Sequence, residues 1–185
     1  MNQTIVDMVD PSLIYRADLD NFSPASALVY PVEKKGAVYV LKAAYDSNVQ
    51  EYSHVSREKE VLERAGDISG ITKLVYDYGK VGKYIAILKE YFEGDDLEAL
   101  GVGKLDNKDL WGQLEKTLTE LNSLGITNLD LRNQNIVLSL DRTKVKIIDM
   151  GTYDLKDTMN RNEWERLRQI NFNLLKSFFT PDAYG

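Results

Sequence analysis

Cysteine is absent from this 185-residue chain, and histidine occurs once. Without cysteine the chain can have no disulfide framework, no thiolate zinc site and no thiol nucleophile. A single histidine excludes a histidine cluster for a metal ion. Any chemistry must therefore come from carboxylates, amides, hydroxyls and amines.

Long apolar runs and an excess of positive charge are also missing. The apolar stretches are far shorter than the ~20 residues that span a bilayer, and the N-terminus lacks the basic and apolar pattern of a signal peptide. The 29 acidic and 23 basic residues give a net charge of −6, which argues against a protein that holds nucleic acid through its overall charge. We therefore expect a cytoplasmic globular domain with no membrane span and no nucleic-acid partner.

The first half of the chain is predicted to be rich in strands. Within the first 45 residues, segments 12–18, 26–32 and 37–45 carry β-branched and tyrosine side chains, and a turn is predicted at 33–36. Apolar residues then recur at helical spacing over residues 51–65, with Gly66 as the stop. Strand character returns over residues 71–92.

The second half is predicted to be helical around a small hairpin. Asp106 or Asn107 can cap a helix that ends at Gly125. Residues 135–139 and 144–149 predict two short strands joined by a turn, and Asn162 is predicted to cap a final helix. The apolar stripe of the first of these helices consists of Leu110, Leu114, Leu118 and Leu121.

Two charged residues interrupt apolar faces in the first half. Lys42 shares a strand face with Val40, and Glu58 lies on the stripe formed by Val55 and Leu62. Burying a charge is expensive unless it is paired, so these positions predict an ion pair between adjacent elements. Solvated positions at the edges of the strand and the helix are the alternative for the two residues taken alone.

Two acids occupy unusual places in the second half. Asp130 lies between two leucines, with Asn135 five residues later, and Asp149 ends an apolar strand just before Met150 and Gly151. An acid at the end of a strand beside glycine is a frequent ligand position, although turn formation explains many single cases. The order of the five polar residues along the chain is more informative than any one of them: Lys42, Glu58, Asp130, Asn135 and Asp149.

That order resembles the motifs of the protein kinase-like superfamily. Lys42 in YVLK resembles the V-A-I-K lysine, and Glu58 resembles the glutamate of the family's αC helix. Asn128–Asn135 (NLDLRNQN) resembles H-R-D-L-x-x-x-N, and Asp149-Met150-Gly151 resembles D-F-G. The segment Glu90-Tyr91-Phe92-Glu93-Gly94 is similar to the E-Y-x-x-G segment that cradles adenine.

The resemblance covers residues 13–155 and implies a two-lobed α+β fold in one kinase-like domain. A small antiparallel N-terminal sheet with the αC helix is expected over about residues 10–92, hinge included. A truncated helical C-lobe is expected over residues 93–185.

An ATP- and Mg²⁺-dependent phosphotransferase is the function that the resemblance implies. Lys42 would hold the α- and β-phosphates, and Glu58 would orient that lysine. Asp130 would accept the proton of the acceptor hydroxyl, and Arg132 matches the position of a lysine that faces the γ-phosphate in many members. Asn135 and Asp149 would hold Mg²⁺. The main chain around three residues would contact adenine: Glu90, Tyr91 and Phe92.

The chain departs from the family pattern in three places. The nucleotide-covering segment over residues 20–29 contains no glycine, so Ser23 and Ser26 would offer hydroxyls to the phosphates instead. Asn128 and Leu129 replace the usual His-Arg pair. Few residues follow Gly151 and no A-P-E occurs, so the helical platform that binds peptide substrates is expected to be missing.

With these departures, the chain resembles the small kinases among bacterial effectors and the RIO-like atypical kinases. A protein Ser/Thr hydroxyl or a small molecule is the expected acceptor, with an activating or substrate-presenting protein as a further partner. An effector would act in a host cytoplasm. Two alternatives stay open: a pseudokinase that serves as a nucleotide- or protein-binding scaffold, and an unrelated α+β domain whose charges are structural.

Overall fold

The computed structural model describes residues 2–20, 28–101 and 104–184. The chain forms two compact units, of which the first comprises Met1–Glu63 and Lys73–Tyr91 and the second Arg64–Thr72 and Phe92–Gly185. Strands dominate the first unit and helices the second, so the predicted α+β fold is confirmed. Ser23 and Ser26, two of the predicted nucleotide ligands, lie outside the described residues.

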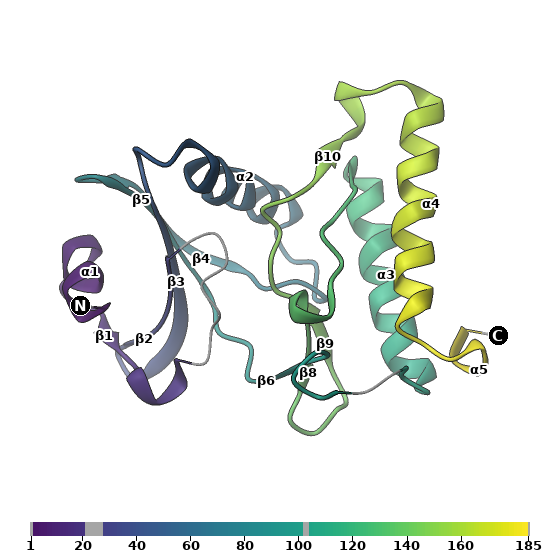
Figure 1. Ribbon diagram of the computed structural model, residues 1–185, viewed down its shortest axis with the longest axis horizontal. Helices are drawn as coiled ribbons and strands as arrows, with labels where there is room; N and C mark the ends of the chain where they lie inside the picture. The colour runs from purple at the N-terminus through teal and green to yellow at the C-terminus, as the bar shows by residue number, and fades with distance from the viewer. Residues whose placement is uncertain (1, 21–27, 102–103, 185) are drawn as a thin grey trace. The chain divides into compact units, whose positions relative to one another are not determined.

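An antiparallel sheet of five strands, in the order β1-β2-β3-β5-β4, forms the centre of the first unit (Figure 1). The strands are β1 (Ile14–Tyr15), β2 (Leu28–Lys34), β3 (Ala37–Tyr45), β4 (Leu74–Val81) and β5 (Tyr84–Glu90). The register pairs Lys42 with Ile87 and Val40 with Lys89. Because directly paired residues share a face and alternate residues repeat it, the two lysines lie on the same face of the sheet.

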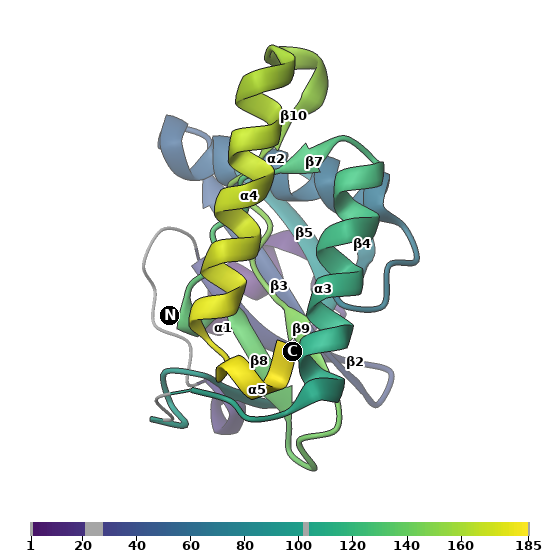
Figure 2. The same ribbon diagram turned by 90° about the vertical axis from the view of Figure 1, so that its right-hand side faces the viewer.

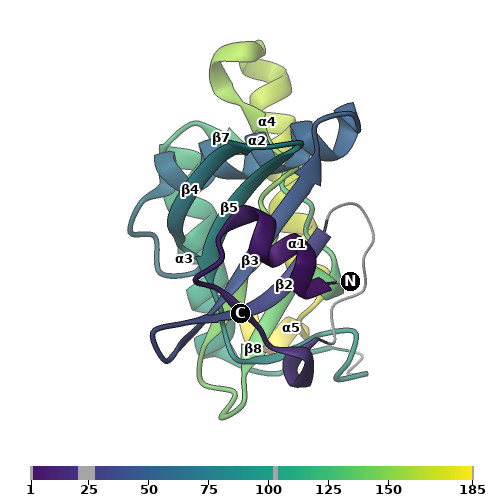
Figure 3. The ribbon, with the colours of Figure 1, turned by 90° about the vertical axis from the view of Figure 1, so that its left-hand side faces the viewer.

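One helix covers each face of this sheet, α1 (Asn2–Val9) on one side and α2 (Val49–Ala65) on the other (Figures 1 and 3). The prediction that residues 2–9 belong to a strand-forming region is wrong. The helix is too short for its period to stand out in the sequence, and its stability comes from packing on the sheet. Its contacts form a buried apolar cluster that includes Val6, Val9, Leu13, Val32, Leu41, Ala43, Ala86 and Leu88.

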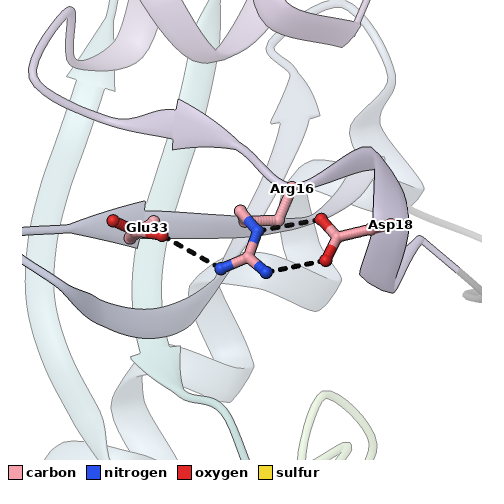
Figure 4. Close-up of polar contacts among 3 residues, drawn as sticks. All are labelled: Arg16, Asp18 and Glu33. Carbon is pink, nitrogen blue, oxygen red and sulfur yellow. Dashed lines mark hydrogen bonds and ion pairs between the residues drawn. The ribbon is translucent and has the colours of Figure 1, made fainter.

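Arg16 ties the chain after β1 to strand β2 (Figure 4). Two nitrogens of its guanidinium donate hydrogen bonds to the Asp18 carboxylate, at 2.8 Å and 2.6 Å. The third nitrogen donates to the Glu33 carboxylate at 2.9 Å. The hydrogen bonds from Arg16 hold the pKa of the exposed Asp18 carboxyl below its usual value. The segment predicted as a strand over residues 12–18 therefore pairs only at β1 and continues as the short 3-10 helix η1 (Ala17–Leu19).

Helices α3 (Lys108–Ser123) and α4 (Arg161–Ser177) run side by side in the second unit, followed by α5 (Pro181–Tyr184) (Figure 2). Of the two predicted caps, Asn107 is the one that caps α3, because its side-chain oxygen accepts from two backbone amides at 3.0 Å. The predicted leucine stripe of α3 is buried. In the part of the chain described, no helix has both the length and the hydropathy to cross a membrane.

Asn160, not Asn162, caps α4, so the predicted start of that helix is wrong. The Asn160 side chain accepts from the backbone amide of Glu163 at 3.0 Å. Asn is a favourable cap at either position, and the extended backbone of Asn160 (φ −79°, ψ 165°) is the one that directs its side chain to that amide.

The predicted hairpin is present as β8 (Ile136–Ser139) and β9 (Val145–Ile147), extended to three strands by β6 (Gly94–Asp96). A Cβ atom on Gly94 would lie 1.9 Å from the carbonyl oxygen of Leu138, so only glycine allows this approach. A second, two-stranded sheet pairs β7 (Ile126–Thr127) with β10 (Asp154–Leu155). The remaining short helices are η2 (Asn133–Asn135) and η3 (Lys156–Thr158).

Candidate functional site

The predicted ion pair of the first unit joins β3 to α2. The Lys42 Nζ atom lies 2.7 Å from Oε2 of Glu58. Lys42 is 3% exposed and Glu58 is fully buried, so each charge depends on polar contacts for its stability. The period of two along β3 and the period of 3.6 along α2 bring both side chains to the interface between the sheet and the helix.

A third buried charged residue, which the sequence analysis did not identify, forms an ion pair with the Glu58 carboxylate. The Lys89 Nζ atom lies 2.5 Å from Oε1 of Glu58, and Lys89 is 5% exposed. The signal for this residue was present in β5, where Ile85, Ile87 and Lys89 occupy one face of the strand. A lysine that continues an apolar alternation is a candidate for a buried pair.

The predicted adenine-contacting segment starts where β5 ends. The Glu90 backbone amide donates to the Lys73 carbonyl at 2.9 Å, and the Glu90 carboxylate accepts from the Lys73 amide at 3.2 Å. Tyr91 is the last residue of the first unit and Phe92 opens the final segment of the second. Within the second unit, the Lys146 ammonium lies 5.3 Å from the centre of the Phe92 ring.

The loop around Asp130 is closed by hydrogen bonds within the second unit. The Asn135 side-chain amide donates to the Asp130 carbonyl oxygen at 2.8 Å, and the Asn135 backbone amide donates to the Arg132 carbonyl at 2.9 Å. The Arg132 guanidinium lies 2.6 Å from the Asp130 carboxylate, and both side chains have contact with solvent. The carboxylate predicted as proton acceptor and the cation predicted to face a phosphate are therefore neighbours.

The hairpin brings Asn135 and Asp149 to one end of its strands. Ile136 pairs with Ile147, and the amide of Ile148 donates to the Asn135 carbonyl at 2.9 Å. One Asp149 carboxylate oxygen accepts from the Gly151 amide at 2.9 Å, which forms a turn after the strand.

This donor set fits Mg²⁺ by its chemistry. The Asn135 side-chain nitrogen is engaged with Asp130, which directs a carbonyl oxygen, a hard ligand, to the other side of the amide. Mg²⁺ usually takes one or two protein oxygens together with substrate phosphates. Among the described residues no group of three or more His, Cys, Asp or Glu gathers as a metal site, so an all-carboxylate cage is not the arrangement found there.

Asn171 on α4, a residue not predicted, holds the beginning of this loop. With the Asn171 amide oriented so that its oxygen faces the two donors, this oxygen accepts hydrogen bonds from the backbone amides of Asn128 and Leu129. The two distances are 3.1 Å and 3.2 Å. Asn128 has a positive φ of 53°, and its side chain donates to the Asp154 carboxylate at 2.7 Å. A buried polar residue within the apolar stripe of α4 was the sequence signal for this contact.

A comparison with known protein families agrees with the fold. The protein kinase domain matches residues 25–166, which is most of the chain. The chain therefore belongs to the protein kinase family, and its activity class is that of a kinase-like transferase or a pseudokinase. No curated protein matches it. The roles of the individual site residues stay predictions.

Proposed function

We propose that this chain is an ATP- and Mg²⁺-dependent phosphotransferase that moves the γ-phosphate of ATP to a hydroxyl acceptor. The observation that supports it most directly is the buried pair of Lys42 and Glu58, with 2.7 Å between Nζ and Oε2. A buried ion pair contributes little to stability compared with apolar residues of similar size. Its presence on the two elements where the kinase family places its phosphate-holding lysine and glutamate favours a functional reason.

In this proposal the first unit binds and orients the nucleotide. Lys42 donates to the α- and β-phosphates, and Glu58 restrains the lysine in the direction needed. The main chain of Glu90, Tyr91 and Phe92 contacts adenine. Ser23 and Ser26 are proposed to add hydroxyl contacts to the phosphates.

The second unit supplies the metal ligands and the acceptor side of the reaction. Asn135 and Asp149 hold Mg²⁺, which when bound neutralises phosphate charge. Asp130 accepts the proton that the acceptor hydroxyl loses as its oxygen bonds to the γ-phosphorus, while the bond from that phosphorus to the β,γ-bridging oxygen breaks and ADP leaves. Arg132 pairs with Asp130 at 2.6 Å, and in this proposal its guanidinium turns from that carboxylate to the γ-phosphate.

The acceptor is proposed to be a Ser/Thr hydroxyl of a protein, with a small molecule as the alternative. An activating or substrate-presenting protein is the further partner that this proposal includes. The reaction needs ATP at cellular concentrations. We therefore propose that the protein acts in the cytoplasm.

Thermal unfolding tests nucleotide binding before any acceptor is known. A ligand that binds only the folded state stabilises it by about 2.7 kcal/mol at a hundred times its dissociation constant. We expect ATP with Mg²⁺ to raise Tm, and ATP with a chelator or Mg²⁺ alone to raise it much less. Equal Tm values in all conditions at millimolar ATP would contradict nucleotide binding by this chain.

A pseudokinase is the second candidate, and a sequence observation favours it. The segment over residues 20–29 has no glycine, and Asn128-Leu129 stands where His-Arg is usual. Phosphotransfer to protein and small-molecule acceptors separates the two functions. Turnover that disappears in Asp130→Ala supports the enzyme, whereas nucleotide binding with no turnover above the Asp130→Ala background supports the pseudokinase.

A further inference from the structure

Glu58 has a lysine partner on each of its two carboxylate oxygens. Lys42 approaches Oε2 at 2.7 Å, and Lys89 approaches Oε1 at 2.5 Å. All three residues belong to the first unit, on β3, α2 and β5. The proposed function uses Lys42 and Glu58 and assigns nothing to Lys89.

Packing alone does not explain a lysine at position 89. Its side chain is 6% exposed, and an ammonium held this far from water loses much of its favourable hydration. An isoleucine would continue the face of Ile85 and Ile87 without that loss. The sheet therefore keeps a charge at a position where an apolar side chain would stabilise it at least as well.

The geometry explains what the second lysine can do. The register makes Lys42 and Lys89 diagonal neighbours on one sheet face, a separation that two long side chains can bridge through a shared partner. A glutamate carboxylate that has a contact at only one oxygen rotates easily about the Cγ–Cδ bond, because that torsion has broad energy minima. The hydrogen bond from Lys89 to Oε1 restricts that rotation and keeps Oε2 beside the Lys42 ammonium, with which it forms an ion pair.

We propose that Lys89 is a positioning residue, which fixes the Glu58 carboxylate and through it the Lys42 ammonium. When Lys42 turns to a phosphate, Lys89 keeps a cation on Glu58. This last step rests on the proposed function. The restraint on Lys42 is a property of the first unit and can be measured without ATP.

Nuclear magnetic resonance of the lysine ammonium groups tests the restraint. Lys89→Met removes the charge and keeps an unbranched side chain, whereas Lys89→Arg keeps the charge. Lys59→Met is the matched control, because Lys59 also joins α2 to the sheet, through Asp77 at 2.5 Å. The Lys42 ammonium signal is assigned by its loss in Lys42→Arg.

We expect the Lys42 ammonium protons to exchange with water about tenfold faster in Lys89→Met, a factor that corresponds to ~1.4 kcal/mol. Lys89→Arg and Lys59→Met should leave the rate near that of the wild type. An unchanged rate in Lys89→Met, or an equal increase in Lys59→Met, overturns the proposal. If Lys89→Met does not fold, the wild type is measured instead. Two slowly exchanging ammonium signals are then expected, one from Lys42 and one from Lys89. The absence of either signal overturns the proposal.

A double-mutant cycle with Glu58→Gln tests whether Lys89 acts through Glu58. Lys89→Met should lower kcat by about tenfold while KM for ATP changes by less than about threefold. The same change in the Glu58→Gln background should cause no further loss, and additive losses overturn the proposal. A wild type without turnover would contradict the proposed function, and the ammonium exchange rates would still decide the role of Lys89.

Discussion

The side-chain amide of Asn135 donates a hydrogen bond to the backbone carbonyl of Asp130 over 2.8 Å. The proposed metal ligand and the proposed proton acceptor are thereby held in one short loop. The contact is made to the backbone of Asp130, so its carboxylate is left to other partners, including Arg132 at 2.6 Å. Substitutions of the Asp130 carboxylate should therefore change the chemistry with little effect on the loop.

Asp130→Ala should separate turnover from nucleotide binding. The carboxylate is proposed to meet the acceptor hydroxyl, and loss of such proton acceptance lowers rates by about 10²–10⁴. We expect the Tm increase with ATP and Mg²⁺ to stay near that of the wild type while phosphotransfer or ATP hydrolysis falls by that factor. A large loss of nucleotide binding in this variant would contradict the role given to Asp130.

Asp149→Ala should remove the dependence of nucleotide binding on Mg²⁺. The variant loses the carboxylate ligand, so ATP should raise Tm equally with and without Mg²⁺. Asp157→Ala, an exposed aspartate in η3, is the control and should respond to Mg²⁺ as the wild type does. A normal Mg²⁺ response in Asp149→Ala would show that the metal ligands lie elsewhere.

Asn171→Leu should loosen the loop that begins at Asn128. Asn171 is 1% exposed, and its replacement leaves two backbone amides without this acceptor. An unsatisfied buried donor costs about 1–3 kcal/mol, so the free energy of unfolding should fall by that order. Hydrogen exchange should accelerate at Asn128 and Leu129, and the exposed Asn173→Ala should leave it unchanged. Protection that persists in Asn171→Leu would refute the contact.

Two glycine substitutions should act in opposite directions on stability. In Gly94→Ala the new Cβ would lie 1.9 Å from a backbone oxygen of β8, which forces the strands apart. In Gly112→Ala the new Cβ meets nothing within 4 Å on the exposed side of α3, so helix propensity should stabilise the protein by about 0.5–1 kcal/mol. Urea unfolding measures both changes, and a neutral Gly94→Ala would contradict the close approach of β6 to β8.

Asp10 should make the stability of the first unit depend on pH. Burial raises the pKa of its carboxyl, but hydrogen bonds from Lys34, Ser12 and Tyr78 outweigh that effect, so the pKa lies well below the usual 3.8. Because the folded pKa is lowered, this contribution is complete above about pH 4 and declines as the pH falls further.

The measurement compares wild type with Asp10→Asn by urea unfolding from about pH 7 to about pH 2.5. The wild type should be the more stable protein at neutral pH. The difference should narrow below about pH 4, because protonation then stabilises the unfolded wild type. A difference that stays constant over the whole range would argue against the lowered pKa.

Local patterns were sufficient to predict several parts of this molecule. The alternation along β3 and the helical period of α2 placed Lys42 and Glu58 on facing surfaces, because backbone geometry alone sets which residues share a face. The helix cap, predicted at Asp106 or Asn107 and found at Asn107, and the hairpin of β8 and β9 were also correct, since each depends on contacts within a few residues. The family resemblance, carried by short motifs in order over residues 13–155, was confirmed by a protein kinase domain match over residues 25–166.

Such local patterns could not predict contacts between residues that are far apart in the sequence. Helix α1 was missed because its stability comes from a sheet that starts after it, and Asn171 because its partners lie on a loop before α4. Lys89 lies 31 residues after Glu58, and nothing local to either residue indicates the other.

The sequence by itself determined which charged residues are placed on apolar faces, and therefore which ones need partners. Only the tertiary structure decided how the partners are shared, with one Glu58 oxygen for Lys42 and the other for Lys89. The physical reason is one of range. Burial follows from periods of two and 3.6 residues along the backbone, whereas an ion pair forms with whichever charge the strand register brings within about 3 Å.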